Sequence, residues 1–152
     1  MTELDVIGNS PLDESVISDL ATLICDNEDP INDYVICLKI VESKEMQRYN
    51  RIYRGVNQTT DILSFENRDV PIEDIIEGIE GYTKKRRNLR QCDIIIDINQ
   101  LSRQKGEKTL EKEFRVVLIH GLLHLVGYDH IRNQDASEMK TKEDQYINKV
   151  ID

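Results

Sequence analysis

Hydrophobic residues recur along this chain with two different periods. In residues 10–26, SPLDESVISDLATLICD, apolar side chains lie three or four positions apart, the spacing of one face of a helix. These positions are Val16, Ile17, Leu20, Leu23 and Ile24. Ser10 can cap this helix and Pro11 can occupy its first position. The pattern predicts an amphipathic helix that packs on a core.

Other segments are rich in β-branched and aromatic residues and predict strands. These segments are residues 34–41 (YVICLKIV), 61–65 (DILSF) and 91–98 (QCDIIIDI), with a short first strand over 3–8. The consecutive isoleucines in QCDIIIDI leave no polar face, which is typical of a strand buried on both sides. We therefore expect residues 91–98 to lie in the centre of a sheet.

The remaining helices are predicted from spacing and from helix-end signals. A second helix is expected over 43–54, a short one in 99–106, one that begins after Thr109, and a polar last one over 134–150. Residues 68–90 fit neither period, and we expect them to form an excursion such as a long hairpin. The order of elements predicts an α/β (α+β) fold, a small mixed sheet with helices packed on it, in a single domain over residues 1–152.

Charge changes this picture in one place. The net charge is −9, which argues against broad nonspecific binding to nucleic acid. Residues 84–90, KKRRNLR, nevertheless hold five basic residues in seven. This stretch is either a solvated hairpin tip or a basic finger that touches RNA.

No segment predicts a membrane span or a thiolate metal site. The longest strongly apolar run, residues 114–126, contains Arg115 and is shorter than the roughly 20 residues that cross a bilayer. The N-terminus has no charged-then-apolar leader, so we expect a cytoplasmic location and no membrane partner. The three cysteines form no CxxC pair.

All three histidines fall within HGLLHLVGYDH, residues 120–130. His120 and His124 are four apart, so a helix places both on one face, where they can share a metal ion. Gly127 can end the helix in a left-handed conformation and let His130 fold back toward the pair. The spacing H-x3-H-x2-G-x2-H matches the histidine part of the metzincin pattern HExxHxxGxxH.

One position of that pattern differs, since Gly121 stands where zinc peptidases carry their general-base glutamate. Three neutral imidazoles still leave a fourth position open, the arrangement of a catalytic zinc site. The sequence predicts one Zn²⁺ per chain, although imidazoles also accept nickel or copper. Asp129 is either a turn residue or a group that orients a histidine or accepts a proton. The alternative for the histidines is a pair buried in the core.

HGLLHLVGYDH resembles the HGxLHLxGYDH signature of the YbeY family of metal-dependent endoribonucleases. Residues 53–65, YRGVNQTTDILSF, are similar to the family's YRxxDxxTDVLSF segment, and CDIIIDI is similar to its GDIVI strand. The resemblance covers about residues 34–150, with Cys92 and Asn57 as departures and no close match over 66–90.

The resemblance implies zinc ligands at His120, His124 and His130 and a catalytic role for Arg54. It also implies a zinc-dependent, single-strand-specific endoribonuclease in ribosomal RNA maturation and ribosome quality control. Its partners would be ribosomal RNA, the small ribosomal subunit and assembly proteins. Asp61 and Ser64 either border the same cleft or pack at a strand end.

Two other functions remain open from the sequence. The metzincin spacing favours a metallopeptidase, against which Gly121 weighs. A non-catalytic ribosome-assembly or RNA-binding factor with a structural metal would need neither a general base nor Arg54.

Overall fold

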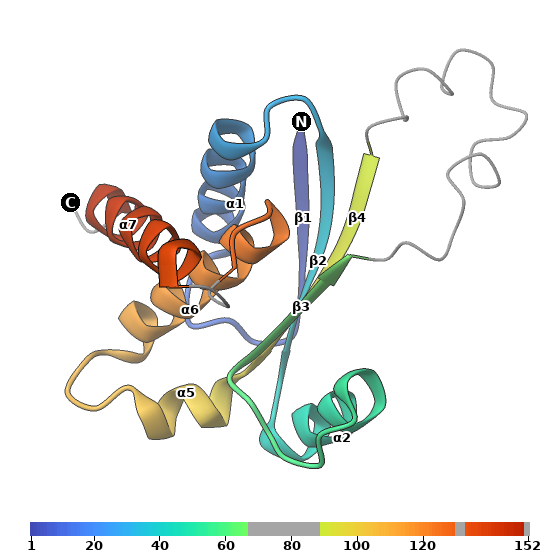
Figure 1. The fold of residues 1–152 in the computed structure, drawn as a ribbon. Helices are drawn as coiled ribbons and strands as arrows, with labels where there is room; N and C mark the ends of the chain where they lie inside the picture. Colours follow the sequence, from blue (N-terminus) through green and yellow to red (C-terminus); the bar gives the residue numbers. More distant parts are fainter. Residues whose placement is uncertain (67–88, 130–132, 151–152) are drawn as a thin grey trace, which may run out of the picture.

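The computed structural model describes residues 1–66, 89–129 and 133–150 (Figure 1). The elements are β1 (Thr2–Ile7), α1 (Glu14–Glu28), β2 (Asp33–Val41), α2 (Ser43–Arg54), β3 (Ile62–Glu66), β4 (Leu89–Asp97), α5 (Ile98–Gln104), α6 (Leu110–Leu125) and α7 (Asn133–Val150). The hairpin predicted over 68–90, most of the basic stretch 84–90 and His130 lie outside the described residues.

The strands form one mixed sheet in the order β1-β2-β4-β3. β1 pairs with β2 and β2 with β4 in parallel, whereas β3 pairs antiparallel with β4 and forms an edge of the sheet. β4 therefore lies inside the sheet, as its isoleucines predict. Ile94 and Ile96 belong to the main core, while Ile95 packs in a second cluster on the other face. The predicted small mixed sheet with packed helices is confirmed.

The helices cover the two faces unequally (Figure 1). α1 and α6 lie on one face and bury the main core, and α7 packs outside α6. On the other face α2 covers one end of the sheet, where Met46 packs against Val41, Leu63 and Ile95. The edge strand β3 thus has α6 on one side and α2 on the other.

Helix boundaries match the predictions except at the first helix. The predicted Ser10 cap is wrong, because the Ser10 hydroxyl accepts a hydrogen bond from the Leu12 amide and closes a turn instead (3.1 Å). The helix begins at Glu14 after Asp13, so the prediction that Pro11 occupies its first position is also wrong. Thr109 does cap α6, with its hydroxyl oxygen accepting from the Lys112 amide (3.1 Å). Along the described ranges, no helix is both long and apolar enough to cross a membrane.

Candidate active-site cleft

His120 and His124 lie one turn apart on α6, and their side chains face each other. The two Nε2 atoms are 3.0 Å apart. Two nitrogens bound to one tetrahedral zinc ion are separated by about 3.3 Å, so the pair fits a shared ion after a small adjustment. Among the described residues no group of three metal-ligating side chains is found. The third predicted ligand, His130, lies outside them.

A glutamate that the sequence did not single out fixes the first histidine. The Nδ1 atom of His120 donates to the Glu143 carboxylate at 2.6 Å, because a carboxylate can only accept. This bond leaves Nε2 of the neutral ring with its lone pair, the atom that a metal needs. Glu143 lies on α7, 23 residues beyond His120. No spacing rule links a polar helix to a ligand that far away in sequence, so pattern reasoning had no signal for it.

The turn after α6 is held from two sides. Gly127 has a φ of 112°, as predicted for the helix end, and its amide donates to the His124 carbonyl at 3.1 Å. The Tyr128 hydroxyl donates to the Glu28 carboxylate at 2.6 Å, and Tyr146 and Lys142 bind the same carboxylate. Burial raises the pKa of Glu28, but the hydrogen bonds from Tyr128 and Tyr146 outweigh it and hold the pKa below its ordinary value. The chain is thus fixed up to the residues that precede His130.

Position 121 faces the sheet and not the cleft. A Cβ atom built on Gly121 would lie 2.5 Å from Cδ1 of Ile62 and 3.9 Å from Cγ2 of Ile94. Gly121 is buried, and it lets α6 approach β3 closely. A glutamate at this position would point into an apolar contact. The general-base glutamate of a zinc peptidase could not occupy this position without displacing Ile62.

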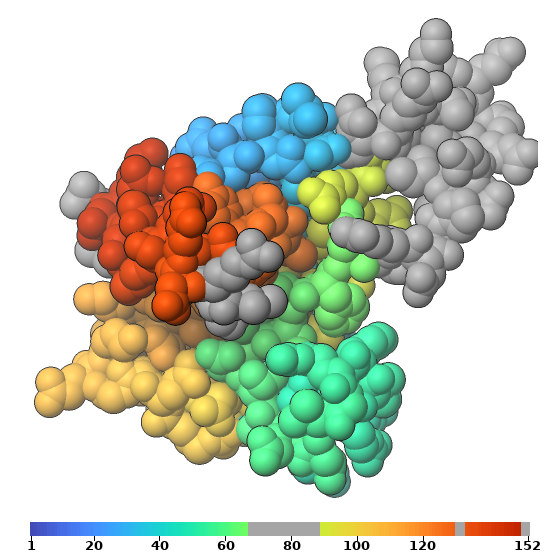
Figure 2. Space-filling model, in the orientation of Figure 1, coloured from blue at the N-terminus to red at the C-terminus, as the bar shows by residue number. Residues whose placement is uncertain are grey.

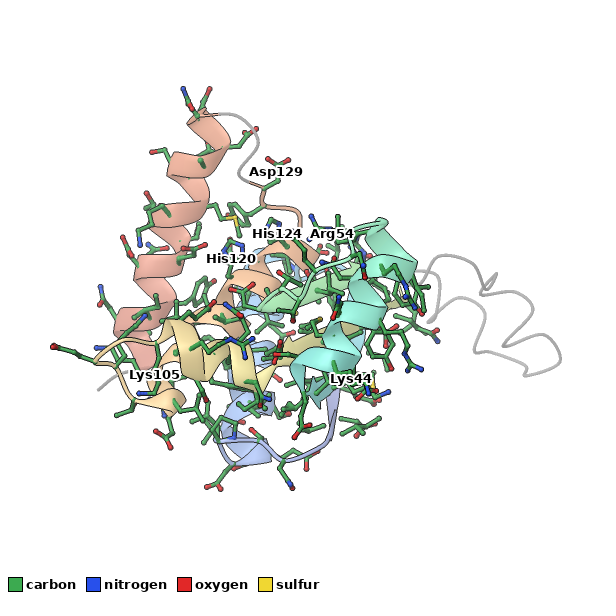
Figure 3. All side chains as sticks on the ribbon, turned by 90° about the horizontal axis from the view of Figure 1, so that it is seen from below. Lys44, Arg54, Lys105, His120, His124 and Asp129 are labelled. Carbon is green, nitrogen blue, oxygen red and sulfur yellow. The ribbon has the colours of Figure 1, made fainter. Side chains whose placement is uncertain are left out.

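The histidines form one wall of a cleft of about 540 Å³. Its lining comes from α2, α6, β3 and the two residues that precede β3: Arg54, Thr60, Asp61, Ile62, Leu63, Ser64, His120 and His124. Figure 3 shows Arg54 at the end of α2 beside His124. Figure 2 shows the surface of α2 and that of α6 and α7 on either side of the segment leading into β3. Arg54, predicted from family resemblance alone, thus shares a cleft with two predicted ligands.

Arg54 occupies its place because α2 ends there. Gly55 adopts a φ of 70° and its amide donates to the Arg51 carbonyl at 3.0 Å, which closes the last turn. The Asn50 side chain donates to the Gln58 carbonyl at 2.8 Å and holds the following segment against the helix. The Arg54 side chain itself is exposed. It can reach an anion in the cleft without first breaking a buried contact.

The buried carboxylate of Asp97 joins α2 to this segment. It accepts hydrogen bonds from the hydroxyls of Ser43 (2.7 Å) and Thr59 (2.6 Å), and its other oxygen caps α5. Asp97 is fully buried, and these four donors satisfy it. From the sequence, Asp97 could be predicted only as part of a strand. Its hydrogen bonds to Ser43 and Thr59 join residues that are far apart in the sequence.

Two carboxylates near the histidines are placed differently. Asp61 lines the cleft and accepts a hydrogen bond from the Gln104 side chain at 3.1 Å. Asp129 is exposed and lines a separate hollow of about 290 Å³, which it shares with Glu28, Asp135 and Glu138. Ser64 lines the cleft beside Asp61. Of these two carboxylates, Asp61 therefore faces the same space as Arg54 and the histidines.

Comparison with known proteins identifies the family. A sequence model described as endoribonuclease YbeY matches residues 8–151. An endoribonuclease YbeY from Petrotoga mobilis is 31% identical, with 98% of this chain and 96% of the relative covered. One from Alkaliphilus metalliredigens is 33% identical, covering 88% and 78%. The solution structure of TM1509 from Thermotoga maritima has the same fold, with a TM-score of 0.59 and 24% identity over 99% of this chain and 89% of that one. These matches confirm the family and the enzyme class that the sequence predicts: the chain belongs to the endoribonuclease YbeY family.

Proposed function

We propose that this protein is a zinc-dependent endoribonuclease whose metal is held by His120, His124 and His130. The observation that carries the proposal is the cleft in which Arg54 faces two histidines whose Nε2 atoms are 3.0 Å apart. The bond from His120 to Glu143 supports it, because ligating histidines commonly donate their other nitrogen to a carboxylate. Bound zinc supplies Lewis-acid polarisation of a phosphate oxygen.

Arg54 has the chemistry to bind the phosphate that is cleaved. Its guanidinium can donate two parallel hydrogen bonds to phosphate oxygens and offset the charge that develops at phosphorus. Because the side chain is exposed at a helix end, water leaves it only when the substrate arrives. Arg54 therefore acts as a substrate clamp and transition-state stabiliser.

Asp61 is the better-placed proton acceptor in this proposal. It shares the cleft with Arg54 and His120, whereas Asp129 borders the neighbouring hollow. Asp61 is within reach of the Gln104 amide, which orients its carboxylate. We propose that Asp61 accepts the proton from the attacking hydroxyl, and that Asp129 acts only through the turn that precedes His130.

The surface of α2 supports RNA as the substrate. This helix carries four basic residues, Lys44, Arg48, Arg51 and Arg54, against one acidic residue, Glu45, in a chain whose net charge is −9. Arg48 and Arg51 line a groove of about 740 Å³ on this helix. Basic side chains along a groove bind a phosphate backbone without reading its sequence.

On the family resemblance we extend the proposal to a cytoplasmic role. The substrate would be single-stranded ribosomal RNA, cleaved in its maturation and in ribosome quality control. The partners would be the small ribosomal subunit and its assembly proteins. The packing of Gly121 against Ile62 weighs against the rival metallopeptidase. A structural metal in a non-catalytic assembly factor would not require Arg54 to face it across a cleft.

The test combines elemental analysis with a cleavage assay on single-stranded RNA. Wild type should hold about one zinc per chain, and His124→Ala should lose both zinc and cleavage while circular dichroism shows that it is folded. Arg54→Ala should keep zinc and lower kcat about 10²- to 10³-fold. Arg51→Ala, one turn earlier and outside the cleft, is the matched control and should raise KM while kcat is kept.

The products and the variants decide between the alternatives. A 2′,3′-cyclic phosphate would indicate attack by the ribose hydroxyl, whereas a simple 3′-hydroxyl or 3′-phosphate would indicate attack by water. Full cleavage by His124→Ala or Arg54→Ala would refute the site. Zinc-bearing wild type that binds RNA and never cleaves it would favour the assembly factor.

A further inference from the structure

A second hollow, of about 580 Å³, adjoins the cleft on the other side of β3. Its lining is Tyr53, Arg54, Leu63, Ser64, Phe65, Glu66 and Asp93. Arg54, Leu63 and Ser64 line both hollows, so the two meet at the edge strand. Because side chains alternate along a strand, Ile62 faces α6 while Leu63 and Phe65 face α2. A strand of RNA whose phosphate lies at Arg54 can therefore place a neighbouring base in this second hollow.

Aromatic rings line one side of this hollow. Tyr53 and Phe65 stack with their centroids 4.9 Å apart and 29° between their planes, and Tyr53 also stacks on Tyr49 at 6.1 Å. Tyr53 nevertheless keeps 57% of its surface exposed. Exposed rings backed by other rings are the usual platform for the bases of single-stranded RNA. This arrangement suits a base and not a further phosphate.

The carboxylate of Asp93 lies on the other side of this second hollow. Asp93 is on β4 directly opposite Phe65 of β3. Burial raises its pKa, and within the described ranges no side chain or amide donates to it. Glu66, the other carboxylate of the hollow, is already bound through both oxygens by Arg90, at 2.7 and 2.9 Å. Asp93 is thus the acceptor that this hollow offers to a ligand.

We propose that the hollow between Tyr53, Phe65 and Asp93 binds a guanine base next to the cleaved phosphate. Guanine presents two adjacent donors, N1–H and the N2 amino group, which match the two oxygens of one carboxylate. Adenine and cytosine place an acceptor beside their amino group, and uracil offers one donor between two carbonyls, so a carboxylate repels part of each. The inference rests on the proposed function, because it assumes that RNA enters the cleft.

The experiment measures binding separately from cleavage. The probes are fluorescein-labelled 2′-O-methyl heptamers of uridine, the same oligomer with one central guanine, and a third with inosine, which lacks the N2 amino group. Fluorescence anisotropy gives Kd for wild type, Asp93→Asn and Asp5→Asn. Asp5 is the matched control, because it lies on the same face two strands away, with Cys37 of β2 in register between it and Asp93, and is exposed. The Asp5→Asn variant therefore removes the same charge at a place outside the hollow.

Wild type should bind the guanine oligomer at least about fivefold more tightly than the uridine oligomer, with inosine in between. Asp93→Asn should bring the ratio to within about twofold, and Asp5→Asn should keep the wild-type ratio. Tyr53→Ala should weaken both oligomers by similar factors, because stacking does not distinguish bases. A wild-type ratio near one, or a ratio unchanged in Asp93→Asn, would overturn the base pocket. A parallel cleavage assay uses unmodified heptamers of the same sequences. If wild type cleaves the unmodified uridine heptamer, the nuclease proposal stands whatever this ratio is. If wild type neither binds the methylated heptamers nor cleaves the unmodified ones, both proposals fail.

Discussion

The two walls of the cleft are built in opposite ways. On the α6 wall, His120 is bonded to Glu143, and Gly121 packs against Ile62. On the α2 wall, Arg54 is exposed, and its neighbour Tyr53 in the second hollow keeps more than half of its surface in water. Metal ligands must be held in one geometry before the ion binds, whereas a phosphate clamp stays hydrated until its substrate arrives. Changes on the α6 wall should therefore affect stability and zinc, and changes on the α2 wall should affect RNA.

The largest expected effect comes from installing the peptidase glutamate on the α6 wall. Gly121→Glu directs a carboxylate at Ile62 and Ile94, the apolar side chains nearest to a Cβ at this position. An uncompensated buried charge costs about 3–5 kcal/mol, a large part of the stability of a typical domain. We expect urea unfolding to show that loss, and no cleavage of an unfolded protein substrate.

Gly121→Ala is the matched control for that charge. It adds only a Cβ, which meets the flexible end of Ile62, and alanine favours a helix by about 1 kcal/mol over glycine. Its free energy of unfolding should stay within about 1 kcal/mol of wild type. A stable Gly121→Glu protein with zinc-dependent peptidase activity would show that position 121 tolerates a glutamate. It would then favour the metallopeptidase function.

The next effect tests how the α6 wall holds its metal. Glu143→Gln removes the charge that accepts from His120 and should lower zinc affinity about 10- to 100-fold, measured by competition with a chelator. Asp144→Asn changes an exposed neighbour on the same helix, which pairs with Lys140, and should leave zinc affinity unchanged. Equal affinities in the two variants would mean that His120 needs no carboxylate to bind metal.

Glu143 also shows where sequence reasoning reaches its limit. The helix over 43–54, the buried strand around the isoleucines, the cap at Thr109 and the glycine turn at Gly127 were all predictable, because each depends on residues within a few positions. Contacts between distant elements were not, since packing chooses among many polar residues on each surface. Ser10 failed as a cap for a local reason: its hydroxyl had a nearer amide to bind.

Arg54 on the α2 wall and Asp93 in the second hollow illustrate the same limit. Arg54 could be named only through its family, because nothing in its own sequence neighbourhood separates it from Arg51. Asp93 looked like one polar residue in an isoleucine strand, and its value as an acceptor depends on Phe65, which pairs with it from β3. A residue that recognises a ligand depends on the side chains and the space around it, and these are set by the tertiary structure.

A smaller effect is expected where the α6 wall turns toward His130. Tyr128→Phe removes one hydrogen bond to the Glu28 carboxylate, which still binds Tyr146 and Lys142. The loss should be about 1–2 kcal/mol in urea unfolding. Tyr146→Phe removes a bond to the same carboxylate from α7 and serves as the control. Both should lose similar stability, but only Tyr128→Phe should also weaken zinc binding, because it loosens the turn before His130. Equal zinc affinities in Tyr128→Phe and Tyr146→Phe would mean that this turn does not contribute to metal binding.

The smallest effect, with the opposite sign, is expected from Asp93 on the α2 side. Burial raises the pKa of its carboxyl, while the unfolded chain keeps a value of about 3.9. Between these two values the folded protein binds the extra proton, so its stability falls as the pH rises through that window. Asp93→Asn should remove this slope and be at least as stable as wild type at neutral pH, measured by urea unfolding from about pH 4 to pH 7. Asp5→Asn, which removes an exposed carboxylate, should keep the slope. A carboxylate that costs stability yet lines a hollow is what the proposed guanine pocket requires. A clear loss of stability in Asp93→Asn at neutral pH would instead mean that this carboxylate stabilises the fold. The contrast between the α6 wall and the α2 wall would then be weaker.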